Sequence, residues 1–320
     1  MRSGCAGRAS ILRVHPFRFG VVVNTAASGA DWIARARRAE AIGYATFLVT
    51  DHLGRQLSPL TALMAAATAT TTLRVGSYVF ANDYRHPLVL AREAATIDFL
   101  SGGRLELGLG AGWMTVDYRR LGMPYDPPAK RIDRLAEALP LISRLLSGET
   151  VDHEGPAYRL GGAEVHPRPV QRPRPPIMVG GGGPRMLRLA ARYADIVAIQ
   201  PQFSPKGRAR LREATDGAMA RKVAILREAA GESFERLELN VIVADAGLAG
   251  SGRPVGTSLL AAGKSVATHL VGTPFALYGT VGQLRDALER RRDRFGISYY
   301  ALPSRSLEEM APLVEALAGR

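Results

Sequence analysis

An acidic residue and a histidine stand side by side where they could transfer protons. Asp51 and His52 directly follow the apolar run at residues 47–50, which has the composition of a buried strand. In a parallel β/α barrel the carboxyl ends of the strands face the active site, so this pair could act as acid, base or cofactor contact. The alternative is a capped loop with a hydrogen-bonded histidine. We expect Asp51 and His52 to be the catalytic residues.

Four consecutive glycines, Gly180 to Gly183, could bind a phosphate. They follow the apolar run at residues 176–179, and Pro184 then opens a helical pattern over residues 186–193. Glycines let backbone N–H groups approach a ligand closely, and the start of a helix carries partial positive charge. A purely structural turn would need only one or two glycines. The pattern therefore favours an anion site at this loop.

A third glycine-rich run, at residues 104–113, could hold a flat ring. Gly108, Gly110 and Gly112 alternate there, but the run lacks the G-x-G-x-x-G spacing of a dinucleotide-binding loop. At the end of a barrel strand the same glycines would let a ring lie against the backbone. The sequence shows no metal-ligand spacing, no Walker motif and no nucleophile elbow. We therefore expect no metal site.

These motifs lie in a chain whose β-rich runs and helical patterns alternate. Apolar runs predict strands at residues 19–23, 45–50, 73–81, 104–110, 177–180, 195–200, 237–244 and 297–302. Helical periodicity is clearest at residues 31–42, 87–100, 132–146, 186–193 and 281–295. About eight β/α units in a chain of this length predict a (β/α)8 TIM barrel, an α/β fold, rather than an open doubly wound sheet.

The predicted barrel is a single domain over residues 15–320, with long loops at about 124–174 and 245–274. Residues 1–14 lack the apolar core of a secretory signal and are predicted to be a disordered extension. The one cysteine, Cys5, fits a reducing cytoplasm. Because no apolar run approaches the roughly 20 residues of a spanning helix, we expect a cytoplasmic protein without a membrane partner.

The net charge of +13 comes mainly from arginine, with only four lysines among the 42 basic residues. A nucleic-acid-binding protein would cluster this charge, whereas here the arginines are scattered among acids, as in residues 289–293. We therefore expect no nucleic-acid partner. A positive field would equally favour a phosphorylated or polycarboxylate small ligand.

Several motifs together resemble the luciferase-like family of flavin and deazaflavin oxidoreductases. The segments that carry the resemblance are residues 51–52, 85–87, 95–98, 101–104, 108–113, 180–185, 194–196, 272–274 and 296–300. The similarity runs from about Phe17 to Pro303, almost the whole chain. Asp51–His52 and the run at residues 82–87 are most similar to the branch that uses the 5-deazaflavin coenzyme F420.

The resemblance implies a TIM barrel, usually a homodimer, that binds the deazaflavin ring at the carboxyl ends of the strands and its phosphate on the glycine loop. The cofactor-binding residues that it implies are Tyr78, Val79, Phe80, Asn82, Gly108, Gly110, Ala111, Gly112, Gly181, Gly182, Gly183 and Gln200. His52 would donate a proton or a hydrogen bond near the reactive carbon, and Asp51 would orient its imidazole or touch the ring hydroxyl. The resemblance also implies a bulge in the third strand with a cis peptide bond between Tyr78 and Val79.

One residue departs from the pattern of the family's sugar-phosphate dehydrogenases. Those enzymes carry a glutamate acid where this chain has Trp113, directly after the glycine run. Trp113 cannot donate a proton to a substrate, so sugar-phosphate dehydrogenation is disfavoured. We expect an apolar or aromatic substrate, with Trp113 either in the substrate pocket or as a packing residue.

The predicted function is hydride transfer between coenzyme F420 and a small organic substrate. An FMN-dependent luciferase-like monooxygenase on the same fold is the nearest alternative. A flavin- or deazaflavin-binding protein without catalysis is an alternative of another class, because a fold alone does not fix a function.

Overall fold

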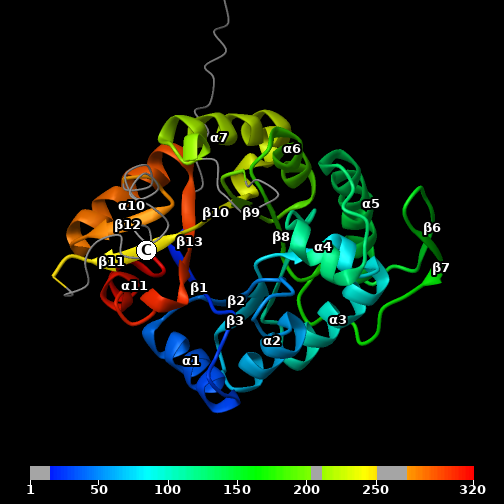
Figure 1. Cartoon of the computed structure of the whole chain (residues 1–320), viewed down its shortest axis with the longest axis horizontal. Helices are drawn as coiled ribbons and strands as arrows, with labels where there is room; N and C mark the ends of the chain where they lie inside the picture. The colour runs from blue at the N-terminus through cyan, green and yellow to red at the C-terminus, as the bar shows by residue number, and fades with distance from the viewer. Residues whose placement is uncertain (1–14, 203–210, 251–271) are drawn as a thin grey trace, which may run out of the picture.

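A ring of parallel strands surrounded by helices forms the centre of the molecule (Figure 1). The computed structural model describes residues 15–202, 211–250 and 272–320. The strands of the ring run in the order β3-β2-β1-β13-β10-β9-β8-β5, and β5 pairs back to β3, which closes the barrel. Their bounds are β1 (Arg18–Val22), β2 (Thr46–Val49), β3 (Arg74–Ser77), β4 (Phe80–Ala81), β5 (Leu105–Gly110), β8 (Ile177–Gly181), β9 (Ile196–Ile199), β10 (Glu238–Ile242) and β13 (Ile297–Pro303).

The third position of the barrel is shared by two short strands. β3 and β4 both pair with β5 and are separated by Tyr78 and Val79, so the closed barrel has 8 strands. The peptide bond between Tyr78 and Val79 is cis, as the resemblance predicts. Each of the predicted apolar runs overlaps a barrel strand. The (β/α)8 TIM barrel is therefore confirmed.

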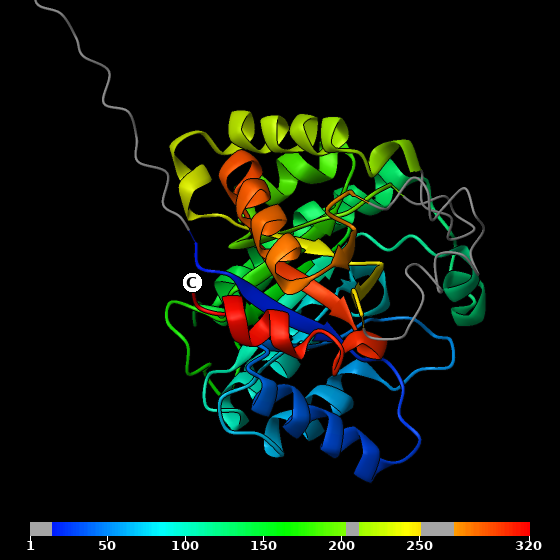
Figure 2. The same cartoon turned by 90° about the vertical axis from the view of Figure 1, so that its left-hand side faces the viewer.

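Helices cover the outside of the barrel, and Figure 2 shows α10 and α11 beside β13 and β1. The helices are α1 (Gly29–Ile42), α2 (Pro59–Thr68), α3 (Pro87–Leu100), α4 (Thr115–Leu121), α5 (Pro128–Leu146), α6 (Pro184–Tyr193), α7 (Asp216–Ala230), α10 (Val281–Phe295) and α11 (Ala311–Leu317). Short 3₁₀ turns lie at Asn82–Tyr84, Leu211–Glu213, Gly231–Arg236 and Ser304–Ser306. No helix among the described residues is both long and apolar enough to span a membrane.

The helix ends follow from local chemistry. The Ser28 hydroxyl accepts a hydrogen bond from the Asp31 N–H at the start of α1, and Gly43 ends that helix with φ 96°. At the start of α10, Thr280 and Gln283 cap each other's backbone N–H groups. These signals explain why α10 coincides with the predicted helix at residues 281–295.

Two segments outside the ring differ from simple loops. Residues 124–174, predicted as a long connection that includes the helix at residues 132–146, contain that helix as α5 and also an antiparallel hairpin of β6 (Val151–Glu154) and β7 (Arg159–Ala163). β11 (Asp245–Leu248) begins the predicted loop 245–274 and pairs with β12 (Ala276–Gly279). Residues 251–271 of that loop, like the predicted disordered extension at residues 1–14, lie outside the described residues.

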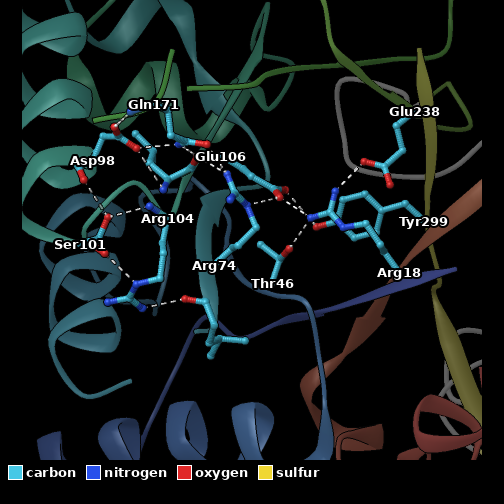
Figure 3. Close-up of polar contacts among 12 residues, drawn as sticks. Arg18, Thr46, Arg74, Asp98, Ser101, Arg104, Glu106, Gln171, Glu238 and Tyr299 are labelled. Carbon is cyan, nitrogen blue, oxygen red and sulfur yellow. Dashed lines mark hydrogen bonds and ion pairs between the residues drawn. The ribbon is translucent and has the colours of Figure 1, made fainter. Parts of the chain in front are cut away.

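Charged side chains fill the inside of the barrel at the amino ends of its strands (Figure 3). Arg18 of β1 donates hydrogen bonds to Glu238 of β10, at 2.5 Å, and to Glu106 of β5. Arg74 of β3 donates to Glu106 at 2.8 Å. Two guanidinium groups thus face two buried carboxylates, and we call these four residues the floor cluster. Its charges compensate one another within the barrel.

The two carboxyl groups of the floor cluster differ in their pKa. Burial raises the pKa of Glu238 to about 7, because its one guanidinium partner, Arg18, is shared with Glu106. Burial alone would also raise the pKa of Glu106, but Arg18 and Arg74 together more than offset this and lower it below the usual range. Glu106 is therefore the anion that holds both cations.

The motif at residues 98–104 joins α3 and β5 to neighbouring loops, as Figure 3 shows. The Asp98 carboxylate accepts hydrogen bonds from the backbone and the side chain of Gln171, at 3.0 and 2.6 Å. Arg104 donates to the carbonyl oxygens of Leu73 at 2.8 Å and Ala67 at 2.7 Å. This part of the resemblance thus has a structural role, because it lies at the amino ends of the strands.

Candidate active site

A cavity of about 500 Å³ lies at the carboxyl ends of the barrel strands. Its wall is formed by the segments that end or follow β2, β4, β5, β8 and β9, together with the start of α5. The predicted site residues that line it are Asp51, His52, Tyr78, Val79, Phe80, Gly110, Ala111, Gly112, Trp113, Gly181, Gly182, Gly183 and Gln200. Segments far apart in the sequence thus meet at one site.

His52 is held by a carboxylate from another part of the chain. Its Nδ1 lies 2.8 Å from an Asp117 oxygen, and the backbone N–H of Leu53 donates to the other oxygen at 3.2 Å. The Asp117 side chain is completely buried, whereas 27% of the His52 side chain is exposed. Because Nδ1 is engaged, Nε2 is the ring nitrogen left for a ligand in the cavity.

Asp51 does not orient His52, which corrects one of the two roles expected for it. Arg85 binds both carboxylate oxygens of Asp51, at 2.6 and 3.1 Å, and the backbone N–H of Ala81 donates to it at 3.0 Å. Asp51 therefore links the end of β2 to the end of β4. The carboxylate that orients the imidazole is Asp117 from α4, which the sequence interpretation missed.

Trp113 lies beside His52 and contacts it edge to face. The two ring centroids are 5.4 Å apart and the ring planes are at 85°. The hydroxyl of Tyr125 donates to the carbonyl oxygen of Trp113 at 2.8 Å, which ties the segment after β5 to the segment before α5. Trp113 and Tyr125 both line the cavity and give this wall an aromatic character.

Val79 projects from the break between β3 and β4 toward the neighbouring glycines. A Cβ atom on Gly110 would lie only 2.7 Å from Val79 Cγ2, and one on Gly180 would lie 3.1 Å from the same atom. Glycine is required at Gly110 because the β5 backbone packs directly on this valine. The backbone of these glycines and the Val79 side chain thus form an even surface at the bottom of the cavity.

The glycine loop runs from β8 into α6, as the sequence predicts. A Cβ atom on Gly182 would lie 2.0 Å from the carbonyl oxygen of Gln200, so glycine there is needed for the fold itself. At Gly183, which caps α6, the nearest atom to such a Cβ would be Gln202 Nε2 at 3.8 Å. The backbone at Gly183 is therefore open to the cavity, and α6 points its amino end at this loop.

Two predicted cofactor-binding residues do not line the cavity. The Asn82 side chain is buried and donates a hydrogen bond to the Tyr158 hydroxyl at 2.8 Å. Gly108 lies lower in β5, where its N–H and carbonyl both bond to the Ser77 hydroxyl. Both residues support the neighbouring strands from outside the cavity.

Besides Asp117, the sequence interpretation missed Arg131 and Tyr84, which line the cavity. Burial raises the pKa of Tyr84, so its phenol stays protonated and can donate a hydrogen bond. The available signal was position. Asp117 follows the predicted strand end at Gly110 by seven residues, and Arg131 directly precedes the predicted helix at residues 132–146. Among the described residues, no group of three or more His, Cys, Asp or Glu side chains could hold a metal ion.

Comparison with known proteins places the chain among enzymes of related architecture. A family model described as luciferase-like monooxygenase matches residues 11–244. An F420-dependent glucose-6-phosphate dehydrogenase from Microbacterium testaceum is 32% identical over 189 residues, which is 56% of this chain and 55% of that protein. A 5,10-methylenetetrahydromethanopterin reductase from Archaeoglobus fulgidus is 32% identical over 183 residues, 57% of this chain and 52% of that protein. The matched region thus spans about half the length of these curated relatives.

Solved structures with low sequence identity share the fold. The coenzyme F420-dependent tetrahydromethanopterin reductase from Methanopyrus kandleri gives a TM-score of 0.74 at 20% identity, covering 94% of this chain and 97% of that one. The long-chain alkane monooxygenase LadA gives 0.74 at 14% identity, covering 94% and 92%. Since the family model matches most of the sequence, the chain belongs to the luciferase-like monooxygenase family.

Proposed function

We propose that this chain is an oxidoreductase that transfers a hydride between the deazaflavin coenzyme F420 and a small organic substrate. The observation that carries the proposal is the single cavity in which His52, held by the buried Asp117, shares the space with the glycine loop. Relatives that are named F420-dependent support the choice of coenzyme.

The residues of the cavity suit a flat ring with a phosphorylated tail. Val79 and Gly110 form an even surface against which a ring could lie, and Gly183 leaves backbone open at the amino end of α6 for a phosphate. Among the residues that the structure describes, the N–H groups of Gly182 and Gly183 donate no hydrogen bond to the protein. These donors are therefore available to an anion.

His52 would hold or move the proton that accompanies the reaction. Coenzyme F420 supplies the hydride chemistry when it is bound. Asp117 fixes the imidazole so that Nε2 can donate to or accept from a substrate oxygen. Trp113 covers one side of His52 and would exclude water from it. Because Trp113 offers no acid, a sugar phosphate is not the substrate that this site favours.

Equilibrium binding and turnover test the proposal. We expect oxidised F420 to bind the purified protein with quenching of its fluorescence, and FMN to compete only weakly. A substrate panel should then produce an absorbance change of F420 that depends on the substrate. Tight binding of FMN and oxygen-dependent turnover without F420 would instead support the monooxygenase. Binding of F420 without turnover of any substrate would support a non-catalytic binding protein.

A homodimer and a cytoplasmic location are part of the same proposal. A surface groove of about 770 Å³ between α2 and α3 is lined by apolar side chains such as Leu60, Met64 and Leu88, and 49% of Val89 is exposed beside it. A second copy of the chain would bury this surface. Light scattering should give twice the chain mass, and Val89→Asp should convert the dimer to a monomer.

A further inference from the structure

Arg131 is a buried cation in the wall of the cavity with no anionic partner. It lies in the first turn of α5, is 4% exposed and lines the cavity. Its Nη1 donates to the carbonyl oxygen of Asp126 at 2.8 Å, but its buried Nε has no hydrogen-bond partner among the described residues. No carboxylate in the described part of the chain forms an ion pair with it. This is unusual, because buried charges are normally paired.

The acids around Arg131 are already used by other groups. Asp83 binds Arg134 and the Tyr118 hydroxyl. Asp126 binds Arg134 and Lys130 through its carboxylate. Both carboxylates thus already have cationic partners, and the three cations Lys130, Arg131 and Arg134 outnumber them. The positive charge of Arg131 is therefore available to a ligand.

The surroundings of Arg131 present its donors in a fixed direction. Its guanidinium carbon lies 4.2 Å from the centre of the Tyr125 ring and 5.7 Å from that of Tyr118. Stacking on Tyr125 covers a face of the guanidinium group and leaves its N–H edge as the donor surface. Such an edge matches the two oxygens of a carboxylate.

A chain of contacts connects Arg131 to His52. Arg131 stacks on Tyr125, Tyr125 binds the Trp113 carbonyl oxygen, and the Trp113 ring contacts the His52 ring. In the described residues, no hydrogen bond or ring contact joins Arg131 to the glycine loop. These contacts link Arg131 to the wall that carries the proposed proton donor, although the first turn of α5 also meets the start of α6, where Arg185 donates to the carbonyl oxygen of Ala129 at 3.1 Å.

We propose that Arg131 binds a carboxylate of the substrate, so that the enzyme acts on a small organic acid. The inference rests on the proposed function and deepens it: the carboxylate lies against Arg131, the apolar body of the acid against Trp113 and Ile132, and the reacting carbon toward His52. The proposed substrate therefore has an apolar or aromatic body, as expected from Trp113, and also carries a carboxylate. The phosphate in the tail of the cofactor is the other anion that could bind Arg131.

The test compares acids with their neutral amides by calorimetry, using the protein with and without F420. The probes are acetate and benzoate, with acetamide and benzamide as neutral partners. We expect at least one acid to bind at least tenfold more tightly than its amide, and Arg131→Met to abolish this preference while its affinity for F420 stays within about twofold. Arg131→Lys should lose at least threefold for the acid, because an ammonium group lacks the paired donor edge. This variant also tests the proposal if Arg131→Met does not fold.

The matched control is Arg144→Met, which removes a half-exposed arginine that lies in the last turn of the same helix and is paired with Glu149. Its acid binding should equal that of the wild type. Equal binding of acids and amides, or an acid preference that survives Arg131→Met and Arg131→Lys, would overturn the proposal. The proposal would also be overturned if Arg131→Met weakened the binding of F420 but not the binding of the F420 fragment that lacks the phosphorylated tail. Arg131 would then bind the cofactor. An acid preference that depends on Arg131 in a protein that does not bind F420 would support the anion site and refute the proposed function.

Discussion

The two ends of the barrel both carry buried charges, but only one end leaves a charge unpaired. At the amino ends of the strands, Arg18 and Arg74 are paired with Glu106 and Glu238. At the carboxyl ends, Asp51 is paired with Arg85 and Asp117 with His52. Arg131, in contrast, faces the cavity without a counterion among the described residues. The floor cluster therefore serves stability and the opposite end of the barrel serves binding, as is usual in this fold.

Removing Glu106 should give the largest effect on stability. Glu106→Gln leaves Arg18 and Arg74 with Glu238 as their only carboxylate, and loss of one partner from a buried ion pair costs about 3–5 kcal/mol. Chemical denaturation should show this loss in the free energy of unfolding. Glu308→Gln, which breaks an exposed pair with Arg38, should cost less than about 1 kcal/mol. Equal effects would remove the floor cluster from the account of stability.

Removing His52 should affect turnover and leave stability nearly unchanged. We expect His52→Ala to lower kcat by roughly 10² while F420 affinity stays within a few fold. His153→Ala is the matched control, because His153 has the same 27% exposure and pairs with Glu137 at 2.9 Å, but does not line the cavity. Parallel losses of binding and turnover would make His52 a cofactor contact, and no loss in either would make it structural.

The floor cluster should make stability fall as pH rises toward neutrality. Glu238 has a pKa of about 7 in the folded protein, above its ordinary value of 4.5, so folding takes up a proton between these values. The stabilisation from this raised pKa is present in full below pH 4.5 and is lost as pH rises through 7. The free energy of unfolding should therefore fall by roughly 2 kcal/mol between pH 5 and 7.5. Glu238→Gln should abolish this part of the dependence. Identical slopes of Tm against pH in both proteins would refute the raised pKa.

Among substitutions in the glycine loop, one at Gly183 should report most clearly on F420 binding. Gly183→Val places a branched side chain at a position where the backbone has room, and should weaken F420 binding by about tenfold, or 1.4 kcal/mol. Gly29→Val, at the open start of α1, is the control and should leave binding unchanged. Gly182→Val would instead collide with the Gln200 carbonyl and damage the fold. Full F420 affinity in a folded Gly183→Val protein would remove this loop from the site.

The sequence predicted the barrel because its strands are buried on both faces and read as continuous apolar runs. It did not single out α2, whose alanines and threonines show little amphipathic pattern, or the β6–β7 hairpin, which lies outside the ring. The positions of Asp51, His52 and Gly183 at the cavity followed from strand ends alone. Asp117 could not be paired with His52 in this way, because a contact across 65 residues depends on how α4 packs over the barrel.

The most direct test of the account is the crystal structure of the protein in complex with oxidised F420. We expect the ring against Val79 and Gly110 with its reactive carbon toward His52, and the phosphate on the N–H groups of Gly182 and Gly183. The side of the cavity that carries Arg131 should remain open for the substrate. F420 bound elsewhere, or bound in this cavity with its phosphate on Arg131, would contradict the account.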